Sequence, residues 1–262
     1  MTRRLAPNEP SGSPYDDPAI YDAIYDTLDF DVPYWLAVAK DANGPVLEIG
    51  CGTGRVLLRL LEAGADADGI DLAEPMIERL RARAAAKQLK TTALVADMRD
   101  FTMRRKYARA ICAFNSFAHC ASTRDQIATL RCVREHLLEG GALVMHMSYP
   151  SPRYWSEPDA DPVLESEVRH PERLTTLQVW DQRTKDVAGQ RQLSEMEVRE
   201  VTADGRVVAR HVSTTQQRWV YRYELELLFQ AAGFTRWQIL GDFEGKPFTE
   251  PSQQMVAWAW RS

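Results

Sequence analysis

The chain has 262 residues, of which 45% are hydrophobic and 26% charged, an ordinary balance for one large domain or a domain with an insertion. Its formal net charge of −5 argues against nucleic acid as the main partner, because binding to phosphates requires a basic surface. No apolar run is long enough to span a bilayer, and the four cysteines lack zinc-site spacing. We therefore expect a cytoplasmic protein with free thiols, no membrane partner and no metal.

Residues 1–40 are expected to form a tail and a helical cap. Residues 1–14 are polar and rich in Pro and Ser, without the apolar segment of a signal peptide, and are expected to be disordered. From Tyr15 to Lys40, apolar residues recur at helical spacing. The sequence Asn43-Gly44-Pro45 predicts the end of this helical region.

From residue 41 to 149, short apolar runs alternate with amphipathic stretches. The expected strands are 46–49, 67–72, 93–96, 108–114 and 142–147. Helices are expected at 55–63, near Pro75 and at 125–138. Such alternation predicts an α/β fold with a parallel sheet and helices on both of its faces.

The pattern changes after Tyr149, where several prolines precede three strand-like stretches at 174–181, 190–201 and 206–220. The dipeptide Asp204-Gly205 is typical of a hairpin turn. These features predict an antiparallel β insertion over residues 150–220. A helix at 222–232 and strands at 237–240 and 255–260 then complete the first domain, which comprises residues 41–149 and 221–262.

A glycine loop follows the first strand, where the sequence reads Glu48-Ile-Gly50-Cys51-Gly52-Thr-Gly54. Glycines permit positive φ angles and close approach of a ligand, and the helix that follows directs free N–H groups toward the same place. The spacing is GxGxG, whereas the dinucleotide fingerprint requires GxGxxG, and residue 55 is Arg. The loop therefore departs from the NAD pattern.

Two acidic residues end the next two strands. Asp71 is expected beside the glycine loop, where it could accept hydrogen bonds from a ribose diol or cap the following helix. Asp97 could accept the amino group of an adenine, with Met98 packed on the ring, or it could be a turn residue.

Five motifs between Pro45 and Met147 carry a family resemblance. The runs VLEIGCGTG, GIDLAEPMI, VADMRDF, AICAFNSFAHC and LLEGGALVMHM resemble, in order and spacing, the class I S-adenosylmethionine-dependent methyltransferases. The resemblance implies S-adenosylmethionine as the cofactor. It also implies a Rossmann-like seven-stranded sheet of order 3-2-1-4-5-7-6, with an antiparallel β insertion after strand five.

A closer likeness is to the sugar N,N-dimethyltransferases and glycine N-methyltransferases. It rests on the stretch from Tyr21 to Tyr25, on the block from Asp97 to Phe101 and on the β insertion. It implies a small-molecule methyl acceptor, a tyrosine near the sulfonium at Tyr25, and an insertion that builds a homodimer or a substrate lid.

The resemblance also implies which residues contact the cofactor. Those at the methionine and ribose part would be Glu48, Gly50, Cys51, Gly52 and Gly54. Those at the ribose and adenine would be Asp71, Leu72, Met76, Asp97 and Met98. Those facing the methionine end and the substrate would be Phe114, Asn115 and Ser116, with Tyr21 on the N-terminal helix.

The candidate catalytic residues are Tyr25 and His119. Methyl transfer is an in-line displacement at a sulfonium carbon, so the protein mainly positions the nucleophile. Tyr25 could face the sulfonium and orient the nucleophile, or its ring could simply pack on the sheet. His119 could be a general base at the carboxyl edge of the sheet, or a polar loop residue. His136 and His146 are expected to lie away from that edge and to be structural.

The sequence thus predicts an enzyme that transfers a methyl group to a nitrogen or oxygen of a small molecule. One alternative is a non-catalytic S-adenosylmethionine-binding regulatory protein, which would show binding without turnover. A second is an NAD-linked Rossmann enzyme, which the GxGxG spacing disfavours. Nucleic-acid methylation is also disfavoured, because Phe114-Asn115-Ser116-Phe117 stands where an Asn-Pro-Pro-Tyr signature would be expected.

Overall fold

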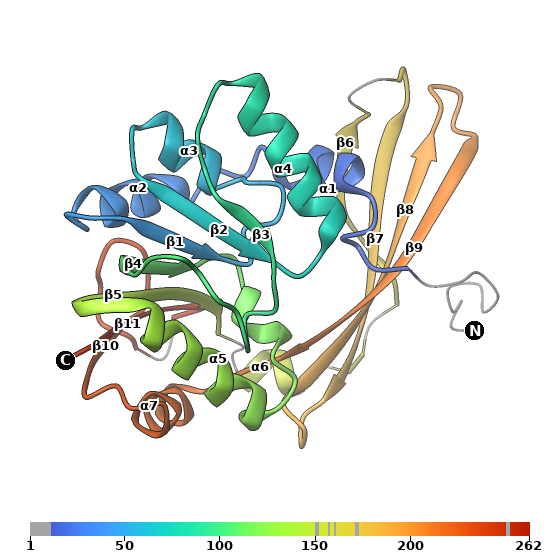
Figure 1. Cartoon of the computed structure of the whole chain (residues 1–262). Coiled ribbons are helices and arrows are strands. Elements are labelled where there is room, and N and C mark those ends of the chain that lie inside the picture. The colour runs from blue at the N-terminus through green and yellow to red at the C-terminus, as the bar shows by residue number, and fades with distance from the viewer. Residues whose placement is uncertain (1–11, 150–151, 157, 160, 171–172, 250–251) are drawn as a thin grey trace. The chain divides into compact units, whose positions relative to one another are not determined.

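The computed structural model describes residues 12–149, 152–156, 158–159, 161–170, 173–249 and 252–262. Residues 1–11 of the predicted tail therefore lie outside the described part of the chain. The chain divides into two compact units (Figure 1). The larger unit comprises Asp29–Ser151 and Arg218–Ser262, and the smaller unit comprises Met1–Leu28 and Pro152–Gln217.

The larger unit is built on a seven-stranded sheet. Its strands are β1 (Val46–Ile49), β2 (Ala67–Asp71), β3 (Ala93–Val95), β4 (Tyr107–Cys112), β5 (Leu137–Ser148), β10 (Arg236–Leu240) and β11 (Gln254–Trp260). They lie in the order β3-β2-β1-β4-β5-β11-β10. The first five are parallel, and β11 runs antiparallel to both β5 and β10. Because β10 and β11 are the sixth and seventh strands of this sheet along the chain, the predicted order 3-2-1-4-5-7-6 is confirmed.

Helices cover both faces of this sheet (Figure 1). The helices of the larger unit are α2 (Val32–Lys40), α3 (Leu57–Glu62), α4 (Glu74–Ala86), α5 (Thr123–His136) and α7 (Arg222–Ala231). Alternation along β1 assigns the faces, because successive side chains of a strand point to opposite sides. Val46 packs in one cluster with residues of α2, α3 and α4, whereas Leu47 packs in the other with residues of α5 and α7.

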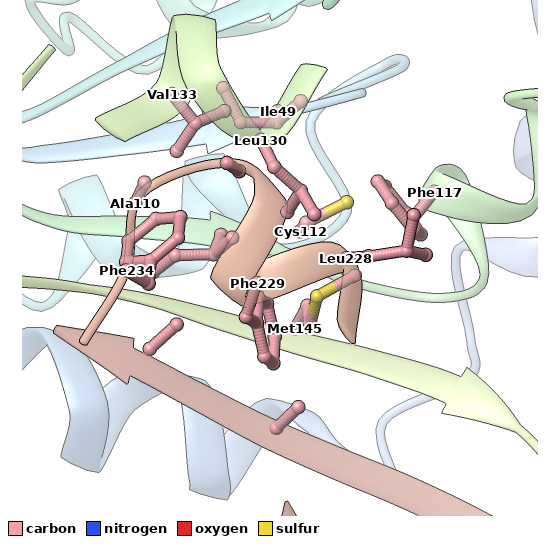
Figure 2. Close-up of a cluster of buried hydrophobic side chains, with 14 of the residues drawn as sticks. Ile49, Ala110, Cys112, Phe117, Leu130, Val133, Met145, Leu228, Phe229 and Phe234 are labelled. Carbon is pink, nitrogen blue, oxygen red and sulfur yellow. The ribbon is translucent and has the colours of Figure 1, made fainter. Parts of the chain in front are cut away.

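The face under α5 and α7 is an apolar core (Figure 2). Phe229 of α7 and the nearby Phe234 are 0% and 2% exposed, and their ring centroids lie 5.7 Å apart. Both belong to the same buried cluster as Met145 of β5. Burial of each such side chain contributes about 1.5–3 kcal/mol, so this face anchors α7 to the sheet. Gly233, just after α7, has a φ of +89°, a conformation that glycine adopts readily at the end of a helix.

The smaller unit contains a four-stranded sheet of order β6-β7-β8-β9, which confirms the predicted β insertion. Its strands are β6 (Val163–Arg169), β7 (Thr176–Asp186), β8 (Arg191–Val201) and β9 (Val207–Arg218). The β6–β7 and β7–β8 pairs are antiparallel. The short helix α6 (Pro152–Ser156) precedes them. Gly205 adopts a φ of +84° in the turn between β8 and β9, where Asp204-Gly205 predicted a hairpin.

Helix α1 (Pro18–Tyr25) packs on this second sheet. Asp17 caps it by accepting hydrogen bonds from the amides of Ala19 and Ile20. Ile24 is buried in a cluster with β7 and β8 side chains. The helices of the predicted N-terminal cap are thus divided, with α1 in the smaller unit and α2 in the larger. None of the described helices is long and apolar enough to cross a membrane.

Candidate functional site

The glycine loop follows β1, and its three glycines, at every second position, have left-handed backbone conformations. Gly50, Gly52 and Gly54 have φ values of +71°, +52° and +92°. A Cβ atom at Gly50 would lie 2.6 Å from Ser116 Oγ, so this glycine also lets the segment after β4 approach the loop. A Cβ at Gly52 would meet no described atom within 4 Å. The loop is therefore tightly packed at Gly50 and open at Gly52, where a ligand can approach the backbone.

Asp71 ties the end of β2 to this loop. Its Oδ2 accepts a hydrogen bond of 2.8 Å from the Gly52 amide, and its Oδ1 accepts one of 2.9 Å from the Ala73 amide. Burial raises the pKa of this carboxyl group above its usual value. The two amides occupy one acceptor position on each oxygen, and a carboxylate has about four. The geometry therefore leaves room for a diol while Asp71 also shapes the turn before α4.

The residues assigned to the adenine differ in accessibility. Leu72 is 67% exposed, whereas Met76 is fully buried within the larger unit. Asp97 is bound by the Arg99 guanidinium, with an Nε–Oδ1 distance of 2.9 Å, and this interaction lowers the pKa of the Asp97 carboxyl. Met98 is partly buried, with its sulfur 3.7 Å from that of Cys120. Leu72 is therefore accessible to a ligand, whereas Met76 contributes to the packing of α4.

The segment after β4 has an unusual backbone. Phe114 and Asn115 have φ values of +49° and +63°, a left-handed conformation that is uncommon for residues other than glycine. The Asn115 side chain holds β5, because its Oδ1 accepts the Ser148 amide at 2.6 Å and its Nδ2 donates to Ser148 Oγ at 3.1 Å. Ser116 begins the 3₁₀ helix η1 (Ser116–His119). Strained backbone of this kind is concentrated at functional sites.

Glu48 and Cys51 are buried beneath the loop. Glu48 is 3% exposed, and burial raises the pKa of its carboxyl to about 8, although the nearby Arg55 opposes the shift. Its Oε2 has no hydrogen-bond partner among the described residues. Burial also raises the pKa of the Cys51 thiol well above its usual range. Cys51 is therefore a packing residue with little thiolate character at neutral pH.

A buried ion pair between Asp31 and Arg55 lies beside the loop. Two hydrogen bonds of 2.6 and 2.8 Å join the guanidinium to the carboxylate, which also accepts the Trp35 indole N–H at 3.0 Å. Although burial alone would raise the pKa of Asp31, these hydrogen bonds and the charge of Arg55 lower it. Sequence reasoning noted Arg55 only as a departure from the dinucleotide pattern and missed Asp31, because no local spacing connects them.

The histidines fall into two groups. His136 is structural, as predicted, since its Nε2 accepts the Met103 amide at 3.2 Å and its ring stacks on Phe101. His119 ends η1, close after β4, and burial lowers its pKa. The prediction for His146 was wrong in position, because this residue lies two residues before the end of β5, at the carboxyl edge of the sheet. The predicted strand ended at 147, so its position near that edge was visible in the sequence.

Tyr21 and Tyr25 lie on α1 in the smaller unit. Their ring centroids are 4.7 Å apart, and the Tyr25 hydroxyl lies 3.9 Å from the Met196 sulfur. Burial raises the pKa of Tyr25, and the charge of Asp181 adds to this shift. Tyr25 is therefore protonated at neutral pH and able to donate a hydrogen bond. Its place beside a sulfonium stays a prediction.

Comparison with known proteins matches residues 46–141 to a family model described as a methyltransferase domain. The chain is 28% identical to cypemycin N-terminal methyltransferase of a Streptomyces species, over 93% of this chain and 96% of that protein. It is 28% identical to dTDP-3-amino-3,4,6-trideoxy-alpha-D-glucopyranose N,N-dimethyltransferase of Streptomyces venezuelae, over 72% and 74% of the two chains. Among solved structures, the S-adenosylmethionine-bound amino pentose methyltransferase CalS10 from Micromonospora echinaspora shares the fold. Its TM-score is 0.70 and its identity 20%, over 92% of this chain and 96% of that one.

Proposed function

Since the chain is a class I S-adenosylmethionine-dependent methyltransferase, we propose that it methylates an amine nitrogen of a small molecule or short peptide. The binding of the cofactor is supported by the open Gly52 backbone beside Asp71 at the carboxyl edge of the sheet. The choice of an amine as the methyl acceptor is supported by the relatives. One is named for the N-terminus of cypemycin and the other for N,N-dimethylation of an amino sugar nucleotide.

An amine acceptor fits the acid–base groups of the chain. Bound S-adenosylmethionine supplies a methyl group already activated by its sulfonium, so the nucleophile needs only a free lone pair. A protonated amine must therefore lose a proton before it attacks. Burial lowers the pKa of His119, which favours the neutral imidazole, the form that can accept a proton. In this proposal Tyr25, which keeps its own proton, orients the amine through its hydroxyl.

We also propose that the smaller unit selects the acceptor and forms a homodimer. The sheet exposes several apolar side chains, which favours a partner surface. Those on its described strands include Val163, Leu164, Leu193, Val207 and Val208. The four cysteines are free, which favours a reducing compartment such as the cytoplasm. The net charge of −5 favours an acceptor other than nucleic acid.

Turnover with matched acceptors tests the proposal. The full chain is incubated with S-adenosylmethionine and each of four probes, and methylated products are identified by mass spectrometry. The probes are a peptide with a free N-terminus, its N-acetylated form, an amino sugar nucleotide and the corresponding hydroxy sugar nucleotide. We expect methylation of a free amine and none of the acetylated or hydroxy probe. Methylation of the hydroxy sugar alone would replace the proposal by O-methylation.

Methylation should depend on His119 and Tyr25 if their proposed roles hold. His119→Ala is expected to lower kcat and to make its fall at acidic pH shallower, because the imidazole no longer titrates and the acceptor loses its proton to solvent. Tyr25→Phe retains the ring but loses the hydroxyl, so it is expected to raise KM for the amine more than it changes cofactor affinity. Unchanged kinetics in a folded variant would remove that residue from the proposed site.

A further inference from the structure

Four polar side chains of the smaller unit form one group, which we call the Asp181 cluster: Asp181, Arg183, Ser194 and Glu165. The β7–β8 register pairs Arg183 with Ser194, and Asp181 lies two residues before Arg183. Paired residues of a sheet point to the same side, and the side-chain period along a strand is two residues. Val179, two residues before Asp181, belongs to the apolar core beneath α1. This face of the sheet therefore changes from apolar to polar within one repeat of β7.

Hydrogen bonds fix the carboxylate at the centre of the cluster. Asp181 is 8% exposed. Its Oδ2 accepts the Arg183 Nε–H at 2.6 Å, and its Oδ1 accepts the Ser194 hydroxyl at 2.5 Å. Another guanidinium nitrogen of Arg183 lies 2.9 Å from Glu165 Oε1. Because two carboxylates share one guanidinium, the cluster has an excess of negative charge.

The hydroxyl of Tyr25 lies beside this cluster. It is 3.9 Å from the sulfur of Met196, and Met196 is the residue of β8 that pairs with Asp181. Burial raises the pKa of Tyr25, the charges of Asp181 and Glu165 raise it further, and the charge of Arg183 lowers it. The charges of the cluster therefore act on the tyrosine that we propose to orient the acceptor amine.

A second tyrosine, Tyr154, borders the cluster. Burial raises its pKa, and the charges of Arg183 and Asp181 act on it in opposite directions. Lys185 Nζ lies 4.9 Å from the centroid of the Tyr154 ring, and the Lys185 amide donates to Asp159, so the two opposite charges at this border balance each other. The Arg183 side chain is 43% exposed, so solvent reaches the cluster. Excess negative charge and aromatic rings both favour a cation at this position.

We infer that the Asp181 cluster binds the positively charged amine of the methyl acceptor. A carboxylate has about four acceptor positions, and these contacts use one on each oxygen of Asp181. An ammonium can donate to the remaining positions and to Glu165 through charge-assisted hydrogen bonds. Binding the protonated form captures the acceptor at neutral pH, and the proton is lost only in the later chemical step. The inference rests on the proposed function, because it names the residues by which the smaller unit recognises the amine.

Calorimetry with two matched peptides isolates this contact. The full chain is saturated with S-adenosylhomocysteine, so that no methyl group is transferred, and is titrated with a tripeptide that has a free N-terminus and with its N-acetylated form. We expect the natural chain to prefer the free amine. Asp181→Asn keeps the side-chain shape but removes the charge, and is expected to weaken binding of the free amine about tenfold without changing the affinity for the acetylated peptide.

Two further variants control for effects on the fold. Glu165→Gln changes a side chain that is 42% exposed, so it tests the cluster even if Asp181→Asn does not fold, and should weaken binding of the free amine about twofold. Glu197→Gln is the matched control on the opposite face, because Glu197 pairs with Trp180, the neighbour of Asp181. Glu197 is 3% exposed and bound by Arg199 at an Nε–Oε1 distance of 2.7 Å. Its substitution should leave both affinities unchanged.

The outcomes separate this inference from the proposed function. Equal losses for both peptides in Asp181→Asn, or no preference of the natural chain for the free amine, would overturn the inference. If the free amine is methylated and Asp181→Asn binds it normally, the proposed function stands and the cluster is structural. If Asp181→Asn selectively loses affinity for the free amine but no amine is methylated, the amine subsite stands and the proposed methyl transfer fails.

Discussion

The two faces of the seven-stranded sheet differ in what they bury. Beneath α7, Phe229 and Phe234 pack among apolar side chains of β4, β5 and β11 (Figure 2). On the opposite face, at the carboxyl edge, the same sheet buries Glu48, His146 and the Asp31–Arg55 pair. The apolar face stabilises the fold, whereas the polar groups are costly to bury. We therefore expect stability to depend mainly on the apolar face and ligand binding on the polar one.

Truncation of the apolar face should have the largest effect on stability. Phe229→Ala removes a fully buried ring and is expected to lower the free energy of unfolding by about 3–5 kcal/mol. Leu227→Ala on the same helix is the control, because Leu227 is 65% exposed and should cost less than about 0.5 kcal/mol. Urea unfolding measures both. Equal effects of the two substitutions would contradict the assignment of this core.

Substitution within the glycine loop should disturb the ligand-binding edge next most strongly. Gly50→Ala imposes a φ of +71° on alanine and brings its Cβ to 2.6 Å from Ser116 Oγ. The expected cost is about 2–4 kcal/mol, with loss of S-adenosylhomocysteine binding by calorimetry. Gly245→Ala has a similar φ of +84° and no described atom within 4 Å of its Cβ, so it should retain binding. A Gly50→Ala protein that binds normally would show that the loop tolerates displacement.

Substitution of Asp71 should affect ligand affinity more than the stability of the fold. Asp71→Asn preserves the side-chain shape but removes the charge that a ribose diol would contact. S-adenosylhomocysteine affinity should fall by about tenfold to a hundredfold, equivalent to about 1.5–3 kcal/mol. Thermal unfolding should change less, because only one of the Gly52 and Ala73 amides loses its acceptor while the other still donates to the asparagine oxygen. If unfolding changes and affinity does not, Asp71 serves the turn before α4 alone.

The smallest expected effect is the acid dependence that His146 contributes. Its pKa is lowered to about 4 in the folded protein, whereas the ordinary value is 6.5. The unfolded chain therefore takes up a proton at higher pH, and stability is lost as the pH falls from about 6.5 toward 4. His146→Phe removes this dependence and should gain about 1–2 kcal/mol relative to the natural chain near pH 5. Parallel unfolding curves of the two proteins between pH 8 and 5 would contradict a buried neutral imidazole.

Much of the fold could be predicted from the sequence because its signals are local. The alternation of apolar runs and helices between residues 41 and 149 gave the parallel core, and the five motifs implied the strand order. Strand β6 was not predicted, because Val163–Arg169 is charged and largely exposed at the edge of its sheet. A strand is recognised in a sequence by the apolar side chains that it buries. This strand buries few side chains, so its sequence gives little indication of it.

The site was predicted in part, for a related physical reason. Gly50, Gly52 and Asp71 follow from motif spacing, and in the structure the Gly52 amide donates a hydrogen bond to Asp71. The Asp31–Arg55 pair joins residues on separate elements, so no local pattern could indicate it. His146 was expected to be structural because its position on the strand was placed away from the carboxyl edge. Its ring nitrogens have no hydrogen-bond partner within the described residues, a property that exists only once the neighbours are placed.

Hydrogen exchange of the full chain with and without S-adenosylhomocysteine tests the contrast between the two faces most directly. We predict increased protection of the amides at 48–55, 71–73 and 113–116, which line the carboxyl edge beside the buried polar groups of the sheet. The amides of α7 should be unchanged, because the apolar face contributes stability and no ligand contact. Protection concentrated in α5 and α7, with none in the glycine loop, would contradict this account of where the cofactor binds.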